Sequence, residues 1–287
     1  MIPVLLALVS AMLFGVAYTF TKKGMDRKAD TYNALITSIG VTFVLSAAAA
    51  LWTSPLKSVV GRQVLPFVAA GVLVPVLSRL LLYMGFSQIG VARTAAVSGT
   101  TPLFSAFLAL FALGEGLTVP AVAGIVLTVS GIVVISEPHR ETKSWKLSGL
   151  SLPLASALMF AVRYTLSRYG LFTSPPLVGA TITSATSLGV LILGWRLVPH
   201  PVLWRLPGAA LRFLLCAGLA YTAAYWCLFG AMASEKLAIV VPLIHTDPLW
   251  SLLFTHLFLR EQHPITPALV AGTCLAVVGS VLIIAGR

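Results

Sequence analysis

Charged side chains are scarce in this sequence. Asp, Glu, Lys and Arg make up only 9% of its 287 residues, while hydrophobic residues make up 58% and the mean hydropathy is +0.98. A soluble domain carries roughly 25% charged residues, so this composition cannot supply a water-facing surface for a chain of this length. The sequence therefore predicts a multi-pass protein of the cell (cytoplasmic) membrane.

Motifs for catalysis, metals and cofactors are also lacking. The sequence has no phosphate-binding Gly-x-x-x-x-Gly-Lys-Ser/Thr motif, which argues against an ATP-driven pump, and no clustered metal ligands or catalytic groups. Its three cysteines, Cys216, Cys227 and Cys274, match no metal-binding spacing and are interpreted as small buried side chains. We expect no enzymatic activity, no cofactor and no metal.

The net charge of +11 does not indicate nucleic-acid binding. The basic residues lie mostly in short connections such as KKGMDRK (22–28) and HRETKSWK (139–146). Short basic loops between apolar segments are typical of a membrane protein. The expected partners are therefore the lipid bilayer and a small-molecule substrate, and not nucleic acid.

Long apolar runs occupy nearly the whole chain. They are too long and too continuously apolar for the alternating strands of a membrane barrel, so we expect an all-α protein with ten transmembrane helices. The expected segments are about 2–22, 31–53, 64–88, 91–113, 119–136, 148–170, 176–197, 208–233, 236–259 and 265–286.

The second half of the sequence repeats the first. Residues 10–24, SAMLFGVAYTFTKKG, match residues 156–170, SALMFAVRYTLSRYG, at seven of fifteen positions, with an offset of 146. We therefore expect two five-helix repeats, residues 1–140 and 147–287. Because five is odd, the second repeat is inverted in the membrane. Transporters built this way hold their substrate near the midplane, between the halves.

Small residues recur at one spacing in the fifth and tenth segments. Small faces of this kind allow helices to approach closely in lipid. They predict either a scaffold pair within the chain or a contact in a homodimer, so monomer and homodimer both stay open. The residues are Gly124, Thr128, Gly131, Gly272, Ala276 and Gly279.

These features together resemble the EamA branch of the drug/metabolite transporter superfamily. The resemblance rests on FGVAYTFTK (14–22), on the proline-containing fourth and ninth segments, and on LFALGEGLTVPAVAGIVLTVSGIVVI (110–135). It covers nearly the whole chain and implies ten helices and transport, often export, of small metabolites, amino acids or drugs without ATP hydrolysis. The chain departs from the family's usual Trp-Gly pair by having Phe14-Gly15.

Two polar residues, His245 and Asp247, interrupt the ninth segment within LIHTDPLW (243–250). Their repeat partners are Gly99 and Thr101, so the ionisable groups occur in one half only. An ionisable residue inside a span is a functional hypothesis by default. The alternatives are a buried structural ion pair for Asp247 and an ordinary hydrogen-bonded histidine for His245.

The prolines of this repeated stretch, Pro102 and Pro248, each remove a helical hydrogen bond and free a carbonyl four residues earlier. Ser251 follows Asp247 at helical spacing, and Thr101 belongs to the matching face of the first half. Freed backbone at membrane depth lines cavities or meets protein partners. We therefore expect Asp247, Ser251 and Thr101 to face the cavity.

Two arginines, Arg79 and Arg163, also fall inside expected spans. Arginine suits bidentate recognition of carboxylate or phosphate groups, so both are candidate substrate-binding residues. The alternatives are charge compensation for Asp247, with Arg79 as its partner, and snorkelling of Arg163 to the membrane surface. A titrating Asp247 would make protons a candidate coupling ion.

Aromatic residues near these charges are candidates for the walls of the substrate site. They could instead be packing positions, since Tyr18 and Tyr164 coincide in the repeat. The candidate residues are Tyr18, Tyr83, Tyr164, Tyr225 and Trp226.

Glu115 and Glu261 coincide in the repeat and precede the fifth and tenth segments. We interpret both as structural residues that accept hydrogen bonds at the start of those helices.

The sequence therefore predicts a secondary transporter of small amino-acid-like or drug-like metabolites. We expect it to export them and to work by alternating access. The alternative is a lipid-linked-sugar flippase subunit or a non-transporting membrane scaffold.

Overall fold

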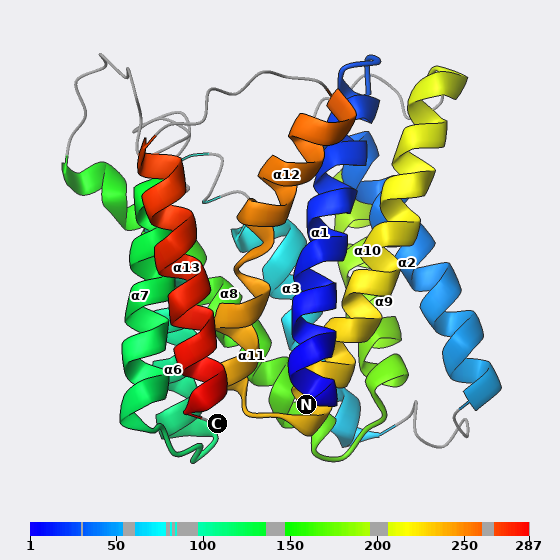
Figure 1. The fold of residues 1–287 in the computed structure, drawn as a ribbon. Coiled ribbons are helices and arrows are strands. Elements are labelled where there is room, and N and C mark those ends of the chain that lie inside the picture. Colours follow the sequence, from blue (N-terminus) through cyan, green and yellow to red (C-terminus); the bar gives the residue numbers. More distant parts are fainter. Residues whose placement is uncertain are drawn as a thin grey trace.

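A computed structural model describes residues 1–29, 31–53, 61–78, 81, 84, 97–135, 147–195, 206–259 and 267–286. Every regular element in these ranges is a helix. The long helices lie side by side, and the chain begins and ends at the same end of the bundle (Figure 1). This arrangement agrees with the all-α fold expected from the sequence.

Each of the ten apolar segments contains helix in its described part. The first half comprises α1 (Ile2–Met25), α2 (Thr31–Thr53), α3 (Leu65–Val72) with its π-helical continuation Leu73–Ser78, α6 (Thr101–Ala112) and α7 (Val119–Ile135). The second half comprises α8 (Ser151–Leu171), α9 (Pro176–Trp195), α10 (Gly208–Ser234), α11 (Leu237–Ile244), α12 (Asp247–Leu259) and α13 (Pro267–Ala285).

Four of these helices, α1, α2, α9 and α10, are long and apolar enough to cross a membrane, with mean hydropathies from 1.6 to 2.1. Their length follows from uninterrupted apolar sequence, since a span needs about 20 such residues. The other helices are shorter within the described ranges, so the number of crossings stays the sequence-based prediction of ten.

The small-residue faces of α7 and α13 pack against each other inside the chain. A Cβ atom placed on Gly124 would lie 2.7 Å from the backbone nitrogen of Ile283, and one placed on Gly131 would lie 2.7 Å from that of Ala276. Such distances leave room only for hydrogen, so these glycines allow the two backbones to touch. Of the two alternatives for these faces, the structure shows the scaffold pair.

The same contact reveals the symmetry of the two halves. Gly124 approaches the carbonyl of Gly279, and Gly131 approaches the carbonyl of Gly272. In the repeat, Gly124 corresponds to Gly272 and Gly131 to Gly279. Gly124 thus contacts Gly279, and their repeat counterparts, Gly272 and Gly131, contact each other. This pattern is that of a two-fold axis, and the two helices run antiparallel. The halves are therefore inverted relative to each other.

Other helix contacts obey the same two-fold relation. Helix α1 packs on α10 and α12, and its repeat counterpart α8 packs on α3 and α6. The corresponding helices α2 and α9 pack on each other, as α7 and α13 do. The interior between the halves is thus built from both repeats.

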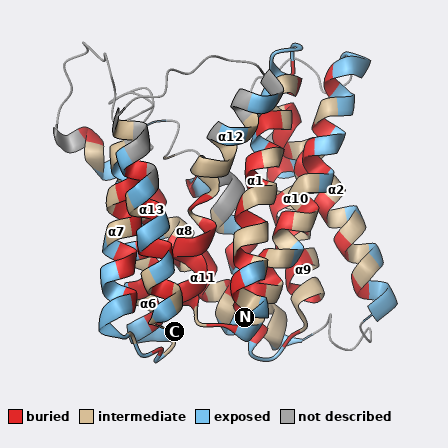
Figure 2. Cartoon of the chain, viewed as in Figure 1, coloured by how far each residue is buried: buried red, intermediate tan, exposed pale blue. Residues whose placement is uncertain are grey.

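Figure 2 shows buried residues where the helices face one another and exposed residues on the outer helices of the bundle. Every residue of α11 is buried, whereas large apolar side chains such as Phe111, Val119 and Leu193 are exposed on other helices. Exposure of many large apolar side chains suits contact with lipid tails. Cys216 and Cys274 are also exposed, which corrects the expectation that they are buried.

Candidate functional site

The fourth and ninth segments are interrupted at equivalent positions. Each has a two-residue turn, at residues 99–100 and 245–246, directly before α6 and α12. The hydroxyl of Thr100 donates to the carbonyl of Val97 at 2.6 Å, and the hydroxyl of Thr246 donates to the carbonyl of Leu243 at 2.7 Å. These matching bonds satisfy backbone groups that an unbroken helix would pair internally.

The prolines stand at the beginning of new helices and not inside continuous ones, which corrects the interpretation from sequence. Pro102 occupies the first turn of α6, and Pro248 is the second residue of α12. Proline is favoured there because the missing N–H has no helical partner anyway. The carbonyl of Ser98, expected to be free, accepts a hydrogen bond from the Thr101 hydroxyl at 2.7 Å.

The break in the second half places Asp247 at the first residue of α12. The phenol of Tyr18, from α1, lies close to the Asp247 carboxyl. His245 is half-buried, and its ring meets the Tyr164 ring edge-on with centroids 6.1 Å apart. The turn therefore places Asp247 beside a tyrosine of α1 and His245 beside a tyrosine of α8. These two helices are counterparts of each other in the repeat.

Close packing of α1 on α12 depends on Gly15. A Cβ atom at this position would lie 2.8 Å from the backbone nitrogen of Ser251 and 2.7 Å from the Cβ of Trp250. The chain departs from the family's usual Trp-Gly pair only at Phe14. The glycine of the pair, Gly15, is present, and no larger residue fits at its position. Ser251 itself is half-buried against α1.

Aromatic rings connect the Asp247 end of the site to the α10 side of the bundle. The Phe14 ring lies 6.3 Å from Tyr18, 6.0 Å from Tyr221 and 5.5 Å from Tyr225 between centroids. Tyr18 also meets Tyr221 edge-on at 5.9 Å. Tyr18 remains 39% exposed, so this cluster is a wall and not a closed core.

Arg163 lies at the far end of this aromatic wall. Its side chain is only 3% exposed, and its guanidinium carbon lies 5.2 Å from the ring centroids of both Tyr164 and Tyr225. The Nε atom is buried without a hydrogen-bond partner among the described residues. The structure therefore places Arg163 in the protein interior, and the snorkelling alternative is wrong.

A cavity lies between α2, α8, α9 and α10, and Arg163 is the one charged residue among the described residues that line it. It contains about 520 Å³ of empty space with its opening included. The described lining residues are Ser38, Ile39, Thr42, Arg163, Ala180, Thr183, Ser184, Ser187, Tyr221 and Tyr225.

The hydroxyl groups of this cavity were missed by the sequence analysis. Thr42 follows Ser38 by four residues on α2, and Ser184 and Ser187 follow Ala180 and Thr183 on α9 with the same periodicity. Polar residues at three- and four-residue spacing within an apolar helix are the signal that could have found them.

The other predicted site residues lie elsewhere. Trp226 is 36% exposed and its indole N–H donates to the hydroxyl of Ser46 on α2 at 2.8 Å. Thr101 is buried at the start of α6 and does not line the cavity. Arg79 and Tyr83 lie outside the described residues, so the proposed Asp247–Arg79 pair stays a prediction.

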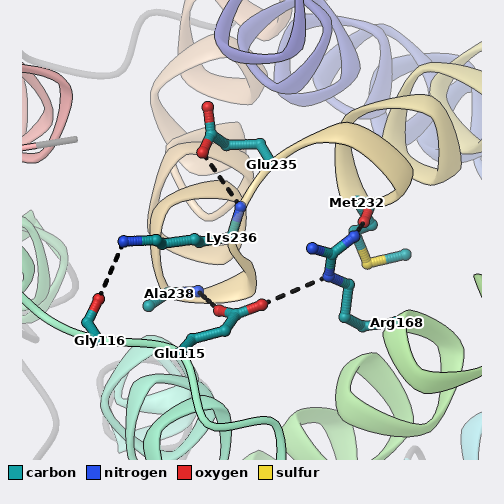
Figure 3. Close-up of polar contacts among 7 residues, drawn as sticks. All are labelled: Glu115, Gly116, Arg168, Met232, Glu235, Lys236 and Ala238. Carbon is teal, nitrogen blue, oxygen red and sulfur yellow. Dashed lines mark hydrogen bonds and ion pairs between the residues drawn. The ribbon is translucent and has the colours of Figure 1, made fainter. Parts of the chain in front are cut away.

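A second polar cluster joins the two halves near the end of the bundle that carries the termini (Figures 1 and 3). Glu115 accepts a hydrogen bond from the backbone N–H of Ala238 at 3.3 Å and forms an ion pair with Arg168 at 3.3 Å. Arg168 also donates to the carbonyl of Met232, and Lys236 donates to the carbonyl of Gly116 at 3.2 Å.

Glu115 thus does accept a hydrogen bond at a helix start, but the helix is not the expected one. It meets the first turn of α11 in the other repeat and not α7, which follows it in sequence. The acidic group complements the positive end of α11 across the interface between the halves. Glu261, its counterpart, lies outside the described residues.

The side chains in these clusters are suited to recognition of a small molecule. No group of three or more His, Cys, Asp and Glu side chains that could hold a metal occurs within the described ranges. The cavity offers one cation, several hydroxyls and aromatic walls. That combination can hold a small polar molecule by hydrogen bonds and apolar contact.

Comparisons with known proteins agree with this architecture. The model of the EamA-like transporter family matches residues 1–137 and again residues 147–285. A solved structure described only as "Crystal structure of protein" has the same fold, with a TM-score of 0.81 and 18% sequence identity over 99% of this chain and 97% of that one. No curated protein matches the chain.

Proposed function

Because the chain belongs to the EamA-like transporter family, we propose that it is a secondary transporter that exports small organic metabolites by alternating access. The observation that carries this proposal is the cavity lined by the buried Arg163, between helices of both repeats. A charged side chain buried in a membrane-embedded cavity marks a substrate or ion pathway.

The two-fold relation between the halves supports alternating access. Inverted repeats can exchange conformations, so that the site opens to one face and then to the other. The Glu115–Arg168–Ala238 cluster ties the halves together near the termini. We expect this cluster to hold that end closed while the cavity is open toward the opposite end.

Broken helices are a second feature that suits transport. The turn at residues 245–246 places Asp247 at the start of α12, against the wall formed by Tyr18 and Tyr221. In this proposal Asp247 carries the coupling proton, and its contact with Tyr18 changes when it is protonated. The alternative role is structural, with the carboxylate complementing the positive end of α12.

A lipid-linked-sugar flippase remains the second candidate, favoured by the exposed apolar faces of the outer helices. A flippase needs a site that opens sideways to lipid, whereas a solute carrier encloses its solute. The cavity between four helices favours the solute carrier.

The test is transport by purified protein in liposomes. Vesicles loaded with a panel of labelled small metabolites should release at least one of them faster than protein-free vesicles do, and faster than vesicles with the Arg163→Gln variant. Inside-out and right-side-out cell-membrane vesicles, assayed with the solute found, then test the export direction. A panel that leaks equally from all vesicles would contradict the proposal.

A further inference from the structure

We infer that the end of the bundle opposite the termini binds the headgroup of an anionic phospholipid, through a basic patch where α1 meets α10. The patch consists of Lys22, Lys23, Arg27, Lys28 and Arg212. The lipid is a ligand of this surface and not the transported solute, so the inference does not rest on the proposed function.

Close packing brings the basic end of α1 onto the first turns of α10. A Cβ atom placed on Gly24 would lie 2.7 Å from Cδ2 of Leu214 and 3.5 Å from the carbonyl oxygen of Ala210. The last turn of α1 therefore touches α10, at the end of the bundle away from the termini (Figure 1). Cations of both helices gather there as a result.

An aromatic ring of α10 restrains two of the cations. The guanidinium carbon of Arg27 lies 4.6 Å from the centroid of the Phe213 ring, and Nζ of Lys23 lies 5.8 Å from the same centroid. Phe20 stacks on this ring with centroids 6.4 Å apart. Two cations gathered at one ring repel each other, and a nearby anion offsets that repulsion. The cation–π contact leaves the N–H groups of Arg27 able to donate to phosphate oxygens.

Positive charge is in excess at this corner. Asp26 is the single acidic residue in α1, in α10 and in the turn after α1. Arg27, Lys28 and Arg212 are exposed and form no ion pair with any residue that the structure describes. Helix α10 begins beside them, and the positive end of its dipole adds to their field. The patch therefore favours an anionic partner.

Lys28 occupies its position at a conformational cost. The turn after α1 is closed by a hydrogen bond from the N–H of Ala29 to the carbonyl of Gly24 at 3.3 Å, and Lys28 within it has a φ of 71°. Glycine is the usual residue at such a left-handed position, because it has no Cβ. A lysine at a position that strains its backbone indicates a use for its side chain.

Exposed apolar side chains next to the patch favour a lipid over a soluble anion. Arg212, Leu215 and Leu219 lie on one face of α10, and the two leucines are 42% and 55% exposed. Helix α10 is long and apolar enough to cross a membrane, so this face meets acyl chains one and two turns beyond the arginine. A molecule with an anionic head and apolar tails matches both parts of the surface.

The experiment measures thermal stabilisation of the purified full-length protein in detergent and counts bound lipids by native mass spectrometry. The probes are dioleoylphosphatidylglycerol, dioleoylphosphatidylcholine, glycerol phosphate and a single-stranded oligonucleotide. Phosphatidylglycerol should stabilise the protein at a concentration about tenfold lower than phosphatidylcholine does, and added salt should weaken only the effect of phosphatidylglycerol. Glycerol phosphate, which has no acyl chains, and the oligonucleotide should stabilise it little.

Variants at the patch assign the contact. Arg27→Gln and Arg212→Gln should each weaken phosphatidylglycerol binding roughly fivefold, in line with the contribution of one cation near an anionic membrane surface. Neither variant should change binding of phosphatidylcholine. The control Arg62→Gln changes an exposed arginine outside the patch, before α3, and should bind both lipids as wild type.

Substitutions of Lys28 separate lipid binding from folding. Lys28→Gly removes the charge and relieves the strained backbone, so the lipid-free protein should melt at the wild-type temperature or above it while phosphatidylglycerol binding falls roughly fivefold. Lys28→Arg keeps the charge and should bind this lipid as wild type. Wild-type binding of phosphatidylglycerol by Lys28→Gly and Arg212→Gln would overturn the inference. So would equal stabilisation by phosphatidylcholine, by glycerol phosphate or by the oligonucleotide.

Discussion

Glu115 and Arg168, one from each repeat, form an ion pair with 3.3 Å between the carboxylate Oε1 and the guanidinium Nε (Figure 3). Both side chains are largely buried, at 8% and 12% exposure. Because the same carboxylate also meets the start of α11, one residue joins the loop after α6, the end of α8 and the ninth segment. The pair is therefore the main polar contact described between the halves at this end.

Replacing Glu115 with Gln should destabilise the protein by about 1–3 kcal/mol, since Arg168 would lose its counter-charge in a buried setting. A lowered melting temperature of the purified protein in detergent would show this. The control Lys236→Gln removes a more exposed contact, to the Gly116 carbonyl, and should shift the melting temperature little. Equal shifts for the two variants would argue against a closing role for the pair.

Gly15→Ala should impair folding, because its Cβ would lie 2.8 Å from the backbone of α12 and force α1 away from the Asp247 turn. Folded yield on size-exclusion chromatography is the measurement. Gly189→Ala is the matched control, since a Cβ there meets nothing within 4 Å. Alanine is the better helix former, so the control should fold at least as well as wild type.

Gly131→Leu and Gly279→Leu should each reduce folded yield, because α7 and α13 approach with backbone atoms in contact at both sites. Gly40→Leu, on an open face of α2, is the corresponding control. If Gly131→Leu and Gly279→Leu have the same melting temperature as the Gly40→Leu control, the α7–α13 contact does not hold the halves together.

Asp247→Asn tests proton coupling. Asn keeps the shape of the side chain and its place beside Tyr18 but cannot exchange a proton. We expect solute binding to survive in part while an imposed pH gradient no longer drives transport in liposomes. A purely structural role predicts a different result, a loss of folded protein. A well-folded variant with unchanged pH dependence would contradict both roles.

Tyr18→Phe complements that experiment, because it removes the phenol that faces Asp247 and keeps the ring contacts with Phe14 and Tyr221. We expect the pH dependence of transport to shift while the yield of folded protein stays near wild type. Tyr169→Phe, an exposed tyrosine of α8, should change neither.

Much of the architecture could be predicted from sequence because it follows from local properties. Uninterrupted apolar runs of about 20 residues become helices in lipid, and the constant offset of 146 identifies the repeat. The odd number of segments per repeat predicts inversion, which agrees with the antiparallel contact of Gly124 with Gly279. The position of Asp247 at a helix break could be anticipated from its neighbouring proline.

Several site residues could be singled out because a polar residue in an apolar span is conspicuous. Asp247, His245 and Arg163 were identified this way, and the structure connects them through Tyr18, Tyr164 and the aromatic wall. Hydroxyl residues are less conspicuous, and only their three- and four-residue spacing sets the cavity-lining ones apart. Thr42 and Ser184 donate to carbonyls of their own helix, and such residues are tolerated on lipid-facing and cavity-facing sides alike.

The sequence by itself determined which segments are helical, where the repeat interrupts them and which charges fall inside apolar segments, since these depend on chain-local hydropathy and spacing. Only the tertiary structure decided which faces meet. It set Thr183, Ser187 and Arg163 around one cavity while leaving Trp226 on the outside, and it turned Glu115 toward α11 in place of α7. The physical reason is that apolar helices in lipid can rotate with little change in hydrophobic burial. Close backbone contacts and interhelical hydrogen bonds therefore choose the rotation, and these join residues far apart in the chain.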